Sequence, residues 1–236
     1  MTPDGPPLRI AFLDVEASGL VPGSYPVEIG YALPRALPWG RCAVEVGSVL
    51  VRPERAWLAR GGWDPDAEAV HGLSREALLR GGLPAGEVCD LLDRVLGGRR
   101  VVTDTGAGST DDEWLAVLYE AAGRGPAGWR VAKATSDEVV HGICLAHGLR
   151  PEIVADVLLS RAPRPTHAAG EDALSDAWRY AAVQQLGRLG VGERSAAGQR
   201  AALRNPERAM PAECWPVVVE PHGGYRRRAP SEGPAP

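Results

Sequence analysis

The chain has 236 residues, of which 44% are hydrophobic, with a formal net charge of −4 and an isoelectric point of about 5.8. This length suits one α/β domain with a tail, or at most two small domains. The acidic balance disfavours a protein that coats long duplexes with a broad basic face, but carboxylates awaiting metal ions would lower the charge of a nucleic-acid enzyme by themselves.

The hydrophobic pattern predicts strands first and then alternating helices and strands. Three strands with short connections are expected at residues 8–15, 25–33 and 43–51, and two more at 100–103 and 129–134. Helices are expected at residues 64–70, 74–79, 85–96, 111–122, 136–147, 151–159 and 170–186. An antiparallel meander followed by such alternation predicts an α/β fold with a mixed five-stranded sheet flanked by helices.

The composition changes near Gly190, where Gly, Arg, Pro and Ala dominate and the periodicity is lost. We therefore predict a folded domain over residues 1–189, with its core at about 8–187, and a tail over 190–236 that is largely disordered. Within this tail only Ser195–Leu203 has a helical pattern. The role of the tail stays open.

The first chemical signal is the pair Asp14 and Glu16 at the end of the first expected strand. Side chains two residues apart on a strand share a face. Two neighbouring carboxylates repel each other, so such a pair calls for a cation. A solvated strand end is the alternative interpretation.

The second signal is the segment from Thr166 to Asp172, which contains His167. Five residues apart on one helix, His167 and Asp172 would point about 140° apart and could not share a pocket. Pro163 and Pro165 keep the chain extended until about Thr166. We therefore expect His167 on the loop and Asp172 in the first helical turn, where both can converge, unless they serve only as packing and capping residues.

The third signal is Asp111 at the start of the helix that follows the fourth strand, with Trp114 and Leu115 after it. An acidic residue in a first helical turn is also common for capping reasons. Asp112 and Asp104 are alternatives for the same role, and the sequence leaves the choice open.

In this order, the motifs resemble those of the DEDDh, or DnaQ-like, 3′–5′ exonucleases of the ribonuclease-H-like superfamily. D-x-E lies on the first expected strand, D-x-x-W-L on a middle helix, and H-x-A-x-x-D before the final helix. Phe12–Leu20, Glu28–Gly30 and Val70–Ser74 are similar to further family segments. The Asn and Phe-Asp common in the family's middle motif are absent. Thr or Ser often follows the acid pair in the family, where this chain has Ala17-Ser18.

The resemblance implies a ribonuclease-H-like fold and hydrolysis of phosphodiester bonds at the 3′ end of single-stranded DNA or RNA. By similarity, Asp14, Glu16, Asp111 and Asp172 would hold two Mg²⁺ or Mn²⁺ ions, hard cations that prefer carboxylate oxygens. His167 would be the general base, because histidine titrates near neutral pH. The alternatives are an inactive nucleic-acid-binding or polymerase-associated adaptor, and an endonuclease of related fold. Homodimerisation and polymerase association stay open.

The remaining signals concern the compartment. The four cysteines form no CxxC pair, which disfavours zinc sites and a disulfide framework. The polar N-terminus and the lack of about 20 consecutive apolar residues predict neither a signal peptide nor a membrane span. A cytoplasmic location is the default expectation.

Overall fold

Five strands form the central sheet in the computed structural model, which describes residues 9–220. The strands are β1 (Ile10–Ala17), β2 (Pro26–Ala36), β3 (Cys42–Leu50), β4 (Arg100–Val102) and β5 (Val217–Val219), in the order β4-β1-β2-β3-β5. β1, β2 and β3 are antiparallel neighbours, whereas β4 runs parallel to β1 and β5 parallel to β3. The predicted mixed five-stranded sheet of α/β class is confirmed.

The fifth strand is not the one that we predicted. Residues 129–134 contribute only an isolated bridge between Val101 and Val131. Beyond this bridge the backbone turns to the preceding loop, where the Ala107 N–H donates to the Ala132 carbonyl at 2.8 Å. The fifth strand is β5, whose three residues lie between Pro216 and Pro221, too short a run to stand out as a strand in the sequence.

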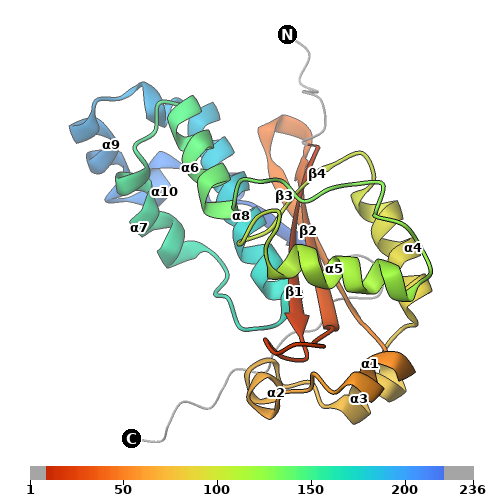
Figure 1. The fold of residues 1–236 in the computed structure, drawn as a ribbon. Coiled ribbons are helices and arrows are strands. Elements are labelled where there is room, and N and C mark those ends of the chain that lie inside the picture. The colour runs from red at the N-terminus through yellow and green to blue at the C-terminus, as the bar shows by residue number, and fades with distance from the viewer. Residues whose placement is uncertain (1–8, 221–236) are drawn as a thin grey trace, which may run out of the picture.

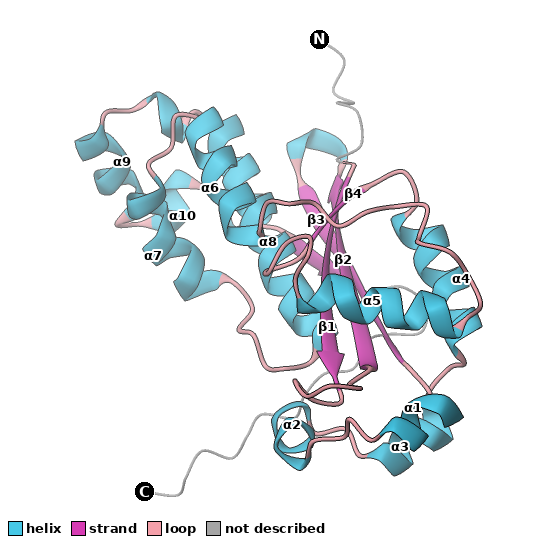
Figure 2. Cartoon of the chain, viewed as in Figure 1, coloured by secondary structure: helices cyan, strands magenta, loops and turns pink. Residues whose placement is uncertain are grey.

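Helices cover both faces of the sheet (Figure 1). α8 (Ala169–Arg188) packs across β1, β2 and β3 on one face. α4 (Ala85–Leu96) and α5 (Thr110–Ala121) belong to the core on the other face. The helices α6, α7, α9 and α10 lie beyond α8, as Figure 2 shows. The remaining elements have these bounds: α1 Arg55–Arg60, α2 Pro65–His71, α3 Arg75–Gly81, α6 Ser136–Ala146, α7 Pro151–Arg161, α9 Ala196–Leu203 and α10 Pro206–Ala209, with short 3₁₀ turns at Pro38–Gly40, Val191–Glu193 and Ala212–Cys214.

β1 supplies both cores because its side chains alternate between the two faces. Ile10 and Phe12 join the core under α8, whereas Leu13 and Val15 join the core under α4 and α5. Asp14 and Glu16 lie on the same face of β1 as Ile10 and Phe12. Both carboxylates therefore project toward the α8 face, at the carboxyl end of the strand.

The segment after Gly190 departs from its predicted disorder. Residues 191–219 form the elements from the 3₁₀ turn at Val191 to β5. Val191, Leu203 and Met210 are buried in the α8-side core, and the Trp178 and Trp215 rings stack with centroids 5.6 Å apart. A few widely spaced apolar residues provide this packing. The overall composition of the segment, on which the prediction rests, does not reveal them. The prediction of a largely disordered tail is wrong for these residues, and residues 221–236 lie outside the described part.

Two further features bear on the compartment signals. All four cysteines are free thiols, and Cys42, Cys89 and Cys144 are buried. Among residues 9–220, no helix combines the length and the apolarity that crossing a membrane requires.

Candidate active site

Two groups of potential metal ligands lie at the carboxyl end of β1. Glu16, His167 and Asp172 form one group, and Asp14, Asp104 and Asp111 form the other. Within each group the ligand atoms lie within 4.8 Å of one another. The five residues that the sequence singled out therefore converge from three distant segments, and Asp104 joins them.

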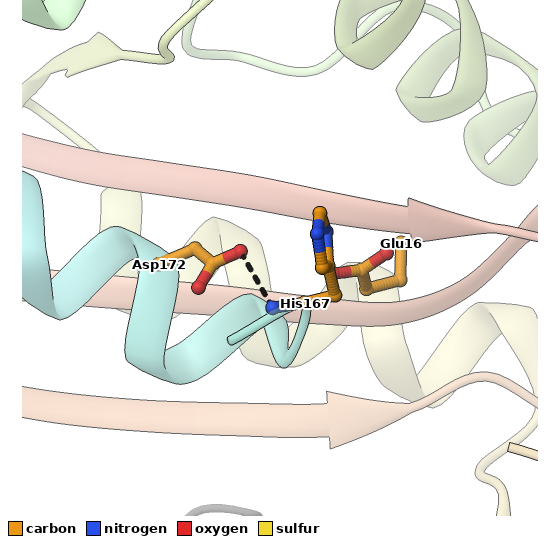
Figure 3. Close-up of side chains that lie close together, drawn as sticks. All are labelled: Glu16, His167 and Asp172. Atoms are coloured by element: carbon orange, nitrogen blue, oxygen red, sulfur yellow. Dashed lines mark hydrogen bonds between the residues drawn. The ribbon is translucent and has the colours of Figure 1, made fainter. Parts of the chain in front are cut away.

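The first group brings β1 and the start of α8 together (Figure 3). Glu16 comes from the strand, whereas Asp172 lies in the first turns of α8 and His167 just before the helix. This confirms the predicted placement of the last two residues. Helix α8 begins at Ala169, so the non-helical chain from Pro163 to Ala168 carries His167 to the same pocket as Asp172.

Backbone N–H groups hold the Asp172 carboxylate. The Thr166 N–H donates to Oδ1 at 2.7 Å and the His167 N–H to Oδ2 at 3.2 Å. His167 has a φ of 58°, a left-handed conformation that a non-glycine residue adopts only at some cost in free energy. This geometry fixes the loop on the carboxylate of Asp172 and leaves the imidazole exposed beside Glu16.

The acidic cluster is strongly coupled electrostatically. Burial, followed by the charges of Asp172 and Glu16, holds the pKa of the Asp14 carboxyl well above its usual range. Burial is also the main cause that raises the pKa of Asp111 to about 6. The pKa of Asp172 is raised by burial too, although the N–H donors above oppose the shift. Such a cluster is relieved by cations that replace the lost water.

The geometry distinguishes the three alternatives for the middle carboxylate. Asp111 is only 4% exposed, and the Thr105 hydroxyl donates to its Oδ2 at 2.9 Å. Asp104 is exposed but belongs to the same ligand group. Asp112, one residue along the helix, accepts from the Gly108 N–H at 3.1 Å and lies in neither group. Asp104 and Asp111 therefore lie close together in one ligand group, and Asp112 lies outside it.

Sequence reasoning assigned no role to Glu28, which positions α8. Its fully buried carboxylate accepts a hydrogen bond from the Ala169 N–H, in the first turn of that helix, at 3.2 Å. Glu28 lies opposite Glu16 in the β1–β2 register, and Gly30 lies opposite Asp14. An anionic group at a helix N-terminus is favourable, so this contact docks α8 beside the carboxylates of β1. An acid within an otherwise apolar strand was the available signal.

Gly30 permits the close approach of α8. A Cβ atom at this position would lie 2.0 Å from the backbone carbon of Ala169, so a side chain there would push the helix away. We expect Gly30→Ala to destabilise the protein by ~1–3 kcal/mol, the usual cost of overpacking, and to reduce metal affinity by displacing Asp172.

Thermal unfolding and Mn²⁺ titration measure both effects. Gly142→Ala is the matched control, because it lies in α6 with no atom within 4 Å of its added Cβ, and alanine there should be neutral or stabilising. Equal melting temperatures for the two variants would contradict the assigned role of Gly30.

A small apolar cavity of about 340 Å³ adjoins the first ligand group. Glu16 lies on its wall, and Leu20, Val70 and Trp114 provide apolar surface. Leu20 is 81% exposed, so the cavity is open to solvent at this residue. We call this space the terminal cavity.

Solved structures share this fold. One is E. coli exonuclease I in complex with a dT13 oligonucleotide, with 13% identity and a TM-score of 0.52 over 81% of this chain and 45% of that chain. Another exonuclease I structure gives 13% identity and a TM-score of 0.52 over 85% of this chain and 45% of that chain. No family model matches the sequence, and no curated protein matches it. The chain spans less than half the length of these two proteins. At 13% sequence identity, the structural similarity to these chains shows the fold alone. This is the ribonuclease-H-like fold expected from the sequence.

Proposed function

We propose that the protein is a metal-dependent 3′–5′ exonuclease of the DEDDh type that shortens single-stranded DNA or RNA. The observation that carries this proposal is the convergence of Asp14, Glu16, Asp111, Asp172 and His167 into two adjoining ligand groups. A chance cluster of acidic residues on a surface would not be expected to include a histidine or to draw its members from three distant segments of the chain. Similarity in fold to the exonuclease I structures supports the same class of activity.

The donor atoms fit two hard divalent cations. Carboxylate oxygens are the ligands that Mg²⁺ and Mn²⁺ prefer, and four carboxylates balance the charge of two such ions. Asp14, Glu16, Asp111 and Asp172 would hold them, and Asp104 offers a further carboxylate in the second group. Bound divalent ions neutralise phosphoryl oxygens, lower the pKa of water and assist the leaving oxygen.

The protein's own groups supply orientation and proton transfer. The imidazole of His167 is exposed beside Glu16, so a ring nitrogen can accept a proton from an attacking water and release it to solvent. The backbone N–H groups of Thr166 and His167 donate to Asp172, and these bonds hold the loop of His167 close to the carboxylates. In this proposal His167 is the general base.

The terminal cavity suits the last nucleotide of a strand. Leu20, Val70 and Trp114 offer apolar surface for a base, since aromatic and apolar side chains pack on the flat faces of bases of any sequence. Because Glu16 lines this cavity, a nucleotide seated there places its 5′ phosphate at the ligand groups. Cleavage would release one nucleotide from the 3′ end.

Purified protein incubated with Mn²⁺ and 5′-end-labelled single-stranded DNA or RNA tests the proposal. We expect a ladder that shortens from the 3′ end and stops on addition of a chelator. Internal fragments without a ladder would indicate an endonuclease instead. Binding of the oligonucleotide without cleavage would indicate an inactive adaptor, and either result would overturn the proposed function.

A further inference from the structure

We propose that the strand on the 5′ side of the cleaved bond runs into a second cavity, where Arg164 contacts its backbone phosphate. This upstream cavity has a volume of about 460 Å³ and lies between α6, α8 and the connection from α7 to α8. The residues of its wall that matter here are Asp104, Leu159, Pro163, Arg164, Pro165 and Arg179. The inference rests on the proposed function and adds the path of the substrate.

The two cavities adjoin different ligand groups. Glu16, of the first group, lines the terminal cavity, and Asp104, of the second group, lines the upstream cavity. On α8, Asp172 belongs to the first ligand group, and Asp176 and Arg179, farther along the helix, line the upstream cavity. A strand with its last nucleotide in the terminal cavity and its phosphate at the carboxylates meets the upstream cavity next.

The charges in the upstream cavity leave one cation available. Arg179 is committed, because it forms ion pairs with Asp137 at 2.7 Å and with Asp176. Asp104 belongs to the second ligand group. Arg164 is exposed and forms no ion pair within residues 9–220. A phosphate entering the cavity would therefore find an unpaired guanidinium, a group suited to bidentate phosphate contacts.

The backbone around Arg164 is suited to holding a strand in place. Pro163 and Pro165 restrict the chain on both sides of Arg164, and Leu159, which is 70% exposed, offers apolar surface nearby. His167 follows three residues after Arg164 on the same connection. A phosphate held by Arg164 thus ties the incoming strand to the loop that carries the general base.

Two substrates separate the upstream contact from the chemistry. The p-nitrophenyl ester of thymidine 5′-monophosphate has one nucleotide and reaches only the terminal cavity, whereas a thymidine oligonucleotide fills both. For Arg164→Ala we expect kcat/KM on the oligonucleotide to fall about tenfold, as for loss of one charge-assisted hydrogen bond. Hydrolysis of the small ester should stay unchanged. The slope of log KM against log salt should decrease by about 0.7.

Arg200→Ala is the matched control, because Arg200 is exposed on α9 and lines neither cavity. Arg164→Lys, which keeps the charge, should restore part of the oligonucleotide rate, and Arg164→Gln provides a second neutral variant. An unchanged oligonucleotide rate in both neutral variants, or equal losses on both substrates, would overturn the proposed path. Wild-type protein that hydrolyses neither substrate would instead overturn the proposed function itself.

Discussion

Asp14→Asn is expected to abolish metal-dependent cleavage while leaving a folded protein that is more stable than the wild type without metal. Asp14 contacts electrostatically every other acid of the site, and burial with these neighbours raises its pKa. Removing its charge removes repulsion from the metal-free protein, but it also removes one carboxylate of the second ligand group. Loss of activity and gain of stability should therefore occur together.

The pH dependence has a defined sign. A carboxyl whose pKa is raised on folding binds more protons in the folded state than in the unfolded state. In a chelator, the stability of the wild type should therefore fall as the pH rises from about 4, the usual range for Asp, through the raised pKa of Asp14 and that of Asp111 at about 6. Asp14→Asn should flatten this fall.

Melting temperatures across this pH range, with and without Mn²⁺, test both effects in parallel with turnover. Mn²⁺ should raise the melting temperature of the wild type more than that of Asp14→Asn, because binding to the folded state stabilises it. Asp156→Asn, an exposed acid on α7, is the control and should change neither. Retained turnover in Asp14→Asn, with contaminating nuclease excluded, would refute a two-metal site at these residues.

Local sequence rules placed most of the site. The alternation of side chains along a strand was enough to put Asp14 and Glu16 on one face, and the prolines before Thr166 were enough to separate His167 from the helix of Asp172. Neither inference needs tertiary contacts, because each depends on the backbone of a few adjacent residues.

The features that the sequence did not reveal depend on contacts between distant segments. Adjacent helical residues point about 100° apart, so an uncertainty of one residue in the start of α5 exchanges Asp111 for Asp112. Asp104 reaches the site because a loop is held by Thr103, whose hydroxyl accepts from the Gly106 N–H at 2.8 Å. Glu28 bonds to a residue 141 positions away. β5 can be identified as a strand only from its pairing with the edge of β3.

Removing the imidazole of His167 is expected to reduce turnover about 10²–10⁴-fold, the usual contribution of general-base catalysis. The backbone N–H of His167 donates to Asp172, so this contact survives loss of the side chain, and the carboxylates should keep their positions. Metal affinity should therefore change little.

The choice of substitution matters because of the backbone at this position. With φ at 58°, alanine would retain the strain of a Cβ atom in the left-handed region, whereas glycine adopts this conformation freely. His167→Gly and His167→Ala should thus lose the same turnover but differ in melting temperature. Agreement of their rates would separate the chemical role of the ring from the stability of the loop.

Three measurements on these variants distinguish the roles open to His167: melting temperature, Mn²⁺ titration and turnover against pH. A histidine that serves only in packing predicts lower stability with nearly normal turnover in the protein that stays folded. A histidine that is itself a ligand, as its place within 4.8 Å of Glu16 and Asp172 permits, predicts weakened Mn²⁺ binding. A general base predicts lost turnover at saturating Mn²⁺. Near wild-type cleavage by folded His167→Gly across pH 6–9 would exclude the ring from the chemistry and leave the proposed activity resting on the carboxylates.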